Sequence, residues 1–269
     1  MIKIGLHLTT YNRILFTEQC LRSIIWSEPR FSKIVIVDNN SKDGTRSLIT
    51  EYFMKKFSII KKTIFNPENR HLGAAVIQGW NYLKDDCDVL GWINNDFLFE
   101  PGWEENLIAC FEELDLDYVV GTVRPDRESN KLKTQSKKGK YTTTDDVGAA
   151  YFLKTKHFLN GVAPSTKPFS KEYVGPGPSF HKQLKKNKLK GVRLAHPGVL
   201  VRDSEYTKPE NIKYYDETFG IRGRENKLEK WRKQENSGNP RGWTNWDKFK
   251  QKYYPDKEKI EKIEKLLRR

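Results

Sequence analysis

Apolar runs and stretches of helical periodicity alternate along the first half of the chain. Short, β-branched and largely apolar runs are typical of strands buried on both faces of a parallel sheet. Five runs of this kind predict strands at Ile2–Leu8, Lys33–Val37, Ile59–Phe65, Val89–Ile93 and Tyr118–Val123. The intervening segments predict helices over Phe16–Trp26, Thr45–Lys56, Gly73–Leu83 and Trp103–Leu114. This alternation predicts an α/β fold with a mostly parallel central sheet flanked by helices.

The pattern is weaker in the second half of the chain. The polar, Lys-rich segment Asp126–Thr144 predicts a loop, and Val147–Leu153 predicts another strand. A short basic helix is expected over Phe180–Lys188, followed by one or two strands within Gly191–Val201. The amphipathic spacing of Asp256–Arg269 predicts a helix at the C-terminal end.

The composition fits a folded protein of a reducing compartment. Of the 269 residues, 36% are hydrophobic and 12% are aromatic, which is enough for a packed core. Three widely spaced cysteines, Cys20, Cys87 and Cys110, indicate neither a disulfide framework nor a zinc site. No apolar run approaches 18 residues, and the sequence begins directly with a strand-like segment. We therefore expect a cytoplasmic protein without a transmembrane segment.

The positive charge is concentrated in the last third of the chain. Residues 181–269 contain 25 Lys and Arg against 13 Asp and Glu, which accounts for +12 of the net charge of +14. Such asymmetry predicts an anionic partner, either nucleic acid, an anionic membrane face or an acidic glycan. A solvated Lys-rich surface without a partner is the alternative.

Polar clusters follow four of the predicted strands. In α/β sheets, ligands bind beyond the carboxyl ends of the strands. The clusters are Thr9–Asn12, Asp38–Ser41, Asn66–His71 and Asn94–Asp96. Because parallel strands end at the same edge of a sheet, the four clusters predict the walls of one pocket.

Each cluster alone has a structural alternative. Asp38–Thr45 is also the pattern of a turn followed by a helix cap, and Gly73 also suits the start of a helix. Asp96 at the end of a buried strand can hold a divalent cation, or it can face solvent in a turn. The motifs GxGxxG and GxxxxGK[ST] are absent, which disfavours Rossmann dehydrogenases and ATP-loop enzymes.

Taken together, the segments LTTYNR, VIVDNNSKDGT, NRHLGAA and INND resemble, in order and interval, the nucleotide-sugar-binding half of family 2 glycosyltransferases. The resemblance covers residues 2–125 and, more loosely, residues 145–205. It implies a GT-A fold with a Rossmann-like sheet over residues 1–205, with a nucleotide-sugar half (1–125) and an acceptor half (126–205). Residues 206–269 are then an aromatic and basic helical extension.

The resemblance also implies an activity. It implies metal-dependent, inverting transfer of a hexosyl or pentosyl group from a nucleoside-diphosphate sugar, such as a UDP-sugar, to a hydroxyl acceptor. The expected donor is thus a nucleoside-diphosphate sugar, and the expected cofactor is Mn²⁺ or Mg²⁺.

The same resemblance assigns roles to the strand-end residues. The residue matching Asp38 contacts the nucleobase, and Thr10 and Tyr11 line the same pocket. Asn12 and Asn40 belong to these clusters, and the loop from Asn69 to Gly73 closes over the nucleoside. The position of the family's Asp-x-Asp motif is taken here by Asn94, Asn95 and Asp96. By resemblance Asp96 is the catalytic metal ligand and Asn94 is a neutral sugar or ribose contact. One carboxylate fewer predicts weaker metal binding.

The acceptor half keeps less of the family pattern. Asp145–Tyr151 resembles the Gly-rich strand beside the acceptor, which places Asp146, Gly148 and Ala149 on the acceptor side. The acidic pair that normally supplies the catalytic base falls on Pro176-Gly177. An inverting transfer needs a carboxylate or imidazole near the attacking oxygen. The candidates are Glu172, His181, Asp146 and Asp203, although each also suits an ordinary loop, helix or turn.

Two acceptor hypotheses follow from the charge. The first is a glycan or lipid-linked saccharide, with residues 181–269 resting on the anionic inner face of the membrane. The second is a hydroxymethylated base in DNA, of the kind that viral sugar transferases modify in the host cytoplasm, where aromatic side chains stack on bases. The aromatic residues meant are Trp231, Trp243, Trp246, Tyr253 and Tyr254. The alternative is that their side chains cap the core. A non-catalytic nucleic-acid-binding protein would explain the charge but not the four clusters.

Overall fold

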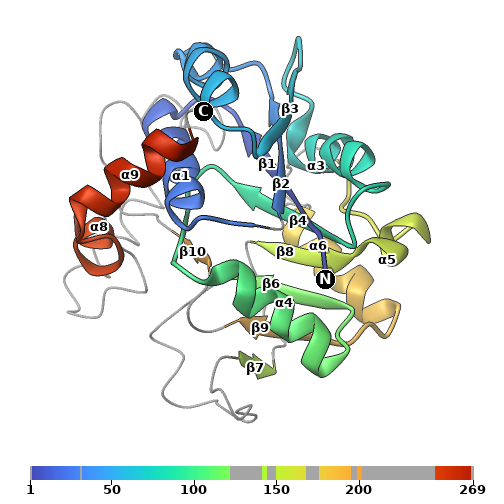
Figure 1. The fold of residues 1–269 in the computed structure, drawn as a ribbon. Helices are drawn as coiled ribbons and strands as arrows, with labels where there is room; N and C mark the ends of the chain where they lie inside the picture. The colour runs from blue at the N-terminus through green and yellow to red at the C-terminus, as the bar shows by residue number, and fades with distance from the viewer. Residues whose placement is uncertain are drawn as a thin grey trace, which may run out of the picture.

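The central feature of the fold is a mixed sheet between two layers of helices (Figure 1). The computed structural model describes residues 2–30, 32–121, 141–143, 150–167, 176–194, 199–201 and 246–267. Within these ranges the sheet has eight strands in the order β3-β2-β1-β4-β8-β6-β9-β7. The predicted residues Asp146, Gly148, Ala149, Glu172 and Asp203 lie outside the described ranges.

The first half of the sheet is parallel, as the sequence predicts. The strand β1 (Ile4–Thr10) pairs in parallel with β2 (Ser32–Asp38) and with β4 (Val89–Asn94), and β2 pairs in parallel with β3 (Ile60–Phe65). The register places Thr10 beside Asp38 and Thr9 beside Asn94. The carboxyl ends of β1, β2 and β4 therefore meet at one edge.

The second half of the sheet mixes strand directions. The strand β8 (Tyr151–Lys154) runs antiparallel between β4 and β6 (Tyr118–Gly121). Next, β9 (Gly191–Leu194) pairs in parallel with β6, and β7 (Tyr141–Thr143) pairs antiparallel with β9. The strand β7 lies within a segment predicted to be a loop, because a three-residue strand is too short to show hydrophobic alternation.

A second, two-stranded sheet extends from the end of β4. Its strand β5 (Phe97–Phe99) begins directly after Asp96 and pairs antiparallel with β10 (Val199–Val201). The sequence does not predict β5 as an independent strand. Its apolar residues continue those of β4 after only a short polar interruption.

The helices cover both faces of the large sheet. The helices of the described ranges are α1 (Ile14–Trp26), α2 (Thr45–Ser47), α3 (His71–Leu83), α4 (Trp103–Leu114), α5 (Thr155–Leu159), α6 (Pro176–Lys186), α8 (Trp246–Tyr253) and α9 (Lys257–Leu267). The segment η1 (Leu48–Met54) continues α2 with the wider turns of a π-helix. The single helix predicted over Thr45–Lys56 is thus divided between two helical geometries.

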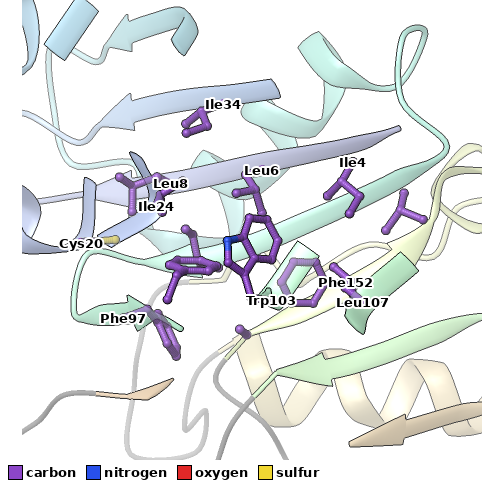
Figure 2. Close-up of a cluster of buried hydrophobic side chains, with 14 of the residues drawn as sticks. Ile4, Leu6, Leu8, Cys20, Ile24, Ile34, Phe97, Trp103, Leu107 and Phe152 are labelled. Atoms are coloured by element: carbon purple, nitrogen blue, oxygen red, sulfur yellow. The ribbon is translucent and has the colours of Figure 1, made fainter. Parts of the chain in front are cut away.

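Alternating strand residues pack into two separate cores. Ile34 and Ile36 of β2 face the core beneath α1, η1 and α4, whereas Val35 and Val37 face the core beneath α3 and α6. Figure 2 shows the first core, in which Trp103 and Phe152 lie beside the side chains of β1. Burial on both faces explains why these strands contain almost continuous apolar residues.

The C-terminal helices pack onto the N-terminal half of the chain (Figure 1). Trp246 of α8 stacks on Trp26 of α1 at 5.1 Å between ring centroids, and Tyr254 contacts the same ring. Phe249 is fully buried and packs against Leu98 and Tyr253.

This packing decides between two hypotheses for three of the aromatic residues. Trp246, Tyr253 and Tyr254 cap the core, so the structure does not support their stacking on DNA bases. Trp231 and Trp243 lie outside the described residues. Among the helices of the described ranges, none is long and apolar enough to cross a membrane.

Candidate active site

Hydrogen bonds join the loops that follow β1 and β2. The backbone N–H of Asn12 donates to Ser41 Oγ at 2.7 Å, and the side-chain oxygen of Asn12 accepts from the backbone N–H of Lys42 at 2.8 Å. At the first residue of α1, the backbone N–H of Ile14 donates to Asp43 Oδ2 at 2.8 Å. The two predicted clusters therefore form one continuous wall.

Residues in these loops adopt left-handed backbone conformations. The φ angles are 53° for Asn12, 66° for Arg13, 71° for Asn40 and 65° for His71. Asparagine and histidine are enriched in this region, whereas for arginine it is uncommon. Such residues gather at functional sites, where the surrounding structure holds them in place. All four follow strand ends at the same edge of the sheet.

Asp38 is the centre of a buried network. Its side chain is fully buried and accepts hydrogen bonds from Thr10 Oγ1 at 2.9 Å, from the backbone N–H of Ser41 at 3.0 Å and from Ser41 Oγ. Arg46 Nε donates to Asp38 Oδ1 at 2.6 Å, and Arg46 Nη2 also donates to the carbonyl oxygen of Asn66. Asp38 thus fixes the loops after three strands.

Gly73 permits a close contact between the two halves of the fold. A Cβ atom at Gly73 would lie 1.8 Å from the carbonyl oxygen of Ser165. Gly73 is buried in the first turn of α3, where it packs against the backbone of Ser165 and does not face open space. Asn69 is exposed in the preceding loop, and its side-chain oxygen accepts from the backbone N–H of His71 at 2.9 Å.

Asp96 forms an ion pair with Arg13. Arg13 Nη1 lies 3.2 Å from Asp96 Oδ2, and the two side chains are 4% and 15% exposed. The guanidinium also lies over the ring of Phe16 at 4.0 Å. The alternative in which Asp96 faces open solvent is therefore wrong. Asp96 is largely buried and has a fixed cationic partner.

The neighbouring amides have their own partners. Asn95 is buried, and its side-chain nitrogen donates to Asn12 O at 3.2 Å and to Thr17 Oγ1 at 2.9 Å. Asn94 Oδ1 accepts from Trp92 Nε1 at 3.3 Å. The strand end therefore presents one carboxylate and two neutral amides.

This donor set fits a divalent cation that takes most of its ligands from elsewhere. Among the described residues, no group of three or more His, Cys, Asp or Glu side chains could hold a metal ion. Asp96 is a hard oxygen donor of the type that Mg²⁺ and Mn²⁺ prefer. A cation at Asp96 would therefore rely mainly on diphosphate and water oxygens.

The predicted nucleotide-binding residues fall into two groups. One group is at least partly exposed and includes Tyr11, Asn12, Asn40, Asn69, Asn94 and Asp96. The other group is buried beneath them and includes Thr10, Asp38, Asn95 and Gly73. The prediction placed all of them in the nucleotide-sugar site, and in this structure the second group supports the loops. The alternation of side chains along the strands and the packing of the loops decide which of these residues are buried. Neither can be read from a sequence motif.

On the acceptor side, α6 begins at Pro176, where the family's acidic pair would lie. Tyr151 Oη of β8 donates to the carbonyl oxygen of Gly177 at 3.3 Å. His181, a candidate base, is buried one turn further along α6. Among the described residues, no carboxylate occupies the start of this helix.

The sequence analysis gave no role to two arginines of the site. Arg13 and Arg46 each pair with one of the two aspartates to which the prediction gave roles. Arg13 is the last residue of the LTTYNR segment, so its position was a usable signal. Arg46 lies eight residues after Asp38, and only the turn geometry brings the two together.

The fold is similar to the folds of two solved proteins. S. aureus TarS 1–349 in complex with UDP-GlcNAc matches with a TM-score of 0.59 and 13% sequence identity, over 76% of this chain and 60% of TarS 1–349. The mannosyltransferase PcManGT from Pyrobaculum calidifontis, in complex with GDP-Man and Mn²⁺, matches with a TM-score of 0.61 and 15% identity. That match covers 85% of this chain and 64% of PcManGT. At such identities the likeness shows the fold alone.

The sequence itself carries the family assignment. The chain spans less than two thirds of the length of either of these proteins. No curated protein matches the sequence. The model of the family described as Glycosyl transferase family 2 matches residues 6–173, which is more than half of the chain. That segment contains all four strand-end clusters, and the chain belongs to glycosyl transferase family 2.

Proposed function

We propose that this protein transfers a sugar from a nucleoside-diphosphate sugar to a hydroxyl group of a glycan or lipid-linked saccharide. The observation that carries the proposal is the shared edge of the sheet, where Tyr11, Asn40, Asn94 and Asp96 are partly exposed around buried supports. Two solved proteins of the same fold are bound to UDP-GlcNAc and to GDP-Man. Their donors support a diphosphate-linked sugar as the ligand of this edge.

The proposed reaction is a displacement at the anomeric carbon. The acceptor oxygen forms a bond to this carbon, and the bond from the carbon to the diphosphate oxygen breaks. The electron pair leaves with the diphosphate, and the acceptor proton passes to a base. Glu172, His181, Asp146 and Asp203 remain the proposed candidates for this base. Direct displacement inverts the anomeric configuration.

The leaving diphosphate is the group that needs stabilisation most. Charges already in position stabilise a developing negative charge without reorganisation. Arg13 is held in place by Asp96 and Phe16, so its charge is fixed at the strand end. A divalent cation bound at Asp96 would supply further neutralisation of the diphosphate.

A basic face formed by α6 and the turn that follows it supports an anionic acceptor or surface. Between Pro176 and Val192 the sequence contains no Asp or Glu. Its exposed lysines are Lys182, Lys185, Lys186, Lys188 and Lys190. Each lysine near an anionic membrane contributes about 1 kcal/mol of attraction. We therefore propose that this face directs the enzyme toward anionic lipid or a phosphate-containing saccharide carrier, on the cytoplasmic side.

The proposal is tested by donor hydrolysis. Purified protein is incubated with UDP-, GDP- and dTDP-sugars in the presence of Mg²⁺ or Mn²⁺, and release of the nucleoside diphosphate is measured. We expect slow hydrolysis of one donor class, and Asp96→Ala lowers it at least about 100-fold. Asp86→Ala is the matched control, because Asp86 is an exposed partner of Lys33 on another surface. Absence of both binding and hydrolysis for every donor would refute the proposal.

A further inference from the structure

We infer that Arg13 is an internal counter-ion which replaces much of the metal's charge, so that the donor diphosphate binds without a divalent cation. The inference rests on the proposed use of a nucleoside-diphosphate donor. Its basis is the ion pair between Arg13 and Asp96, at 3.2 Å, within the strand-end cluster of β4.

The charge of the cluster is the first argument. Asn94 and Asn95 are neutral, so Asp96 is the one carboxylate among the three residues. Arg13 cancels its charge. A site with two free carboxylates repels a diphosphate until a cation neutralises them, whereas a neutral pair does not. Nucleotide binding here therefore does not depend on a metal to remove repulsion.

The second argument is that Arg13 is fixed in place. Its side chain is 4% exposed, it lies over Phe16, and its backbone φ is 66°. The carbonyl oxygen of Arg13 accepts from the backbone N–H of Thr17 at 3.1 Å, which ties it to the first turn of α1. A cation that binds at Asp96 must compete with the guanidinium of Arg13, which is already desolvated and is covalently part of the chain.

The third argument is that the other aspartate of the site has the same arrangement. Asp38 is fully buried, and Arg46 Nε donates to it at 2.6 Å. Both strand-end aspartates to which the sequence analysis gave roles are thus paired with arginines. Within the described part of the site, the positive charge that neutralises each of these aspartates is built into the chain rather than left to a dissociable ion.

The test compares nucleotide binding with and without metal. UDP and GDP are titrated into the full chain by calorimetry, in EDTA and in Mn²⁺. For the wild-type protein we expect the two dissociation constants for the better nucleotide to differ by less than about threefold. In Arg13→Gln the unpaired Asp96 repels the diphosphate, so binding in EDTA weakens at least about tenfold and Mn²⁺ restores it. Arg13→Lys keeps the charge and retains the wild-type ratio.

Two further variants separate this inference from ordinary metal ligation. Asp96→Asn removes the carboxylate, and we expect its affinity for nucleotide in Mn²⁺ to stay within about threefold of wild type. If Asp96 acts mainly as a metal ligand, that affinity falls at least about tenfold. Arg22→Gln is the matched control on α1, since Arg22 pairs with Glu18 at a more exposed position.

Titration with Mn²⁺ alone provides a readout that needs no nucleotide. By electron paramagnetic resonance, Mn²⁺ should bind to Arg13→Gln at least about tenfold more tightly than to the wild type. Adding Asp96→Asn to this variant should remove the gain. Circular dichroism confirms that each variant is folded. A wild-type protein that binds nucleotide only with Mn²⁺ would overturn the inference, as would a folded Arg13→Gln without added metal dependence. If no variant binds any nucleotide, the proposed function fails, and the Mn²⁺ titration still decides the role of Arg13.

Discussion

Replacing Asp38 tests whether this carboxylate supports the site or reads the nucleobase. In the structure it is fully buried and accepts hydrogen bonds from Thr10, from the backbone and side chain of Ser41, and from Arg46. Removing one member of a buried ion pair costs about 3–5 kcal/mol. The Arg46 side chain is one-third exposed, so water partly solvates the guanidinium once its partner is removed. We therefore expect Asp38→Ala to lower the free energy of unfolding by about 3 kcal/mol.

Matched substitutions make the magnitude informative. Asp38→Asn keeps the shape and one acceptor oxygen, so we expect a loss of about 1–2 kcal/mol. Ser41→Ala removes one hydroxyl and should cost about 1 kcal/mol. Urea unfolding followed by circular dichroism measures all three losses. A cost below about 1 kcal/mol for Asp38→Ala would refute the view that Asp38 holds the three loops together.

Nucleotide titrations complete the same test. If Asp38 only supports the loops, Asp38→Asn weakens UDP and GDP binding by the same factor. If Asp38 contacts the base directly, as the family resemblance implies, the ratio of the two affinities changes at least about tenfold while stability changes little.

Two further predictions concern the packing around α3. Gly73→Ala brings a Cβ against Ser165 O, and we expect the overpacking to destabilise the fold by about 2 kcal/mol in urea unfolding, despite the better helix propensity of alanine. A neutral or stabilising effect would show that the close contact is absent in solution. His7 is the second case, since burial lowers its pKa from 6.5 to about 3. The folded state therefore keeps His7 neutral while the unfolded chain takes up a proton below pH 6.5, so this contribution to stability is complete above pH 6.5 and is lost as the pH falls toward 3. Linkage gives a loss of about 2 kcal/mol between pH 7 and pH 5. His7→Gln should remove this part of the pH dependence, and an unchanged slope would contradict the assignment.

The sequence predicts the parallel half of the fold because its signals are strong and local. The runs around Ile34 and Val89 are apolar at nearly every position, as expected for strands covered by helices on both faces. Each of the first four predicted strands ends within two residues of its observed position. The strand β7 was missed because its three residues are too few to show an alternation of apolar and polar positions.

The candidate site is predicted less completely than the fold. Strand ends and motif order indicate Asp38 and Asp96 correctly as parts of one edge. Motifs give residue types but not burial, so they do not distinguish exposed Asn69 from buried Asn95. Nor do they reveal that Arg46 reaches Asp38 across a turn.

The closing contact between α8, α9 and α1 has a consequence for biosynthesis. Tyr254 Oη donates to Ser23 O at 3.3 Å across 231 residues of sequence, and Trp246 covers the Trp26 ring. During translation the first helix emerges long before its cover. The indole surface of Trp26 therefore stays open to chaperones and to other nascent chains until residues 246–267 have left the ribosome.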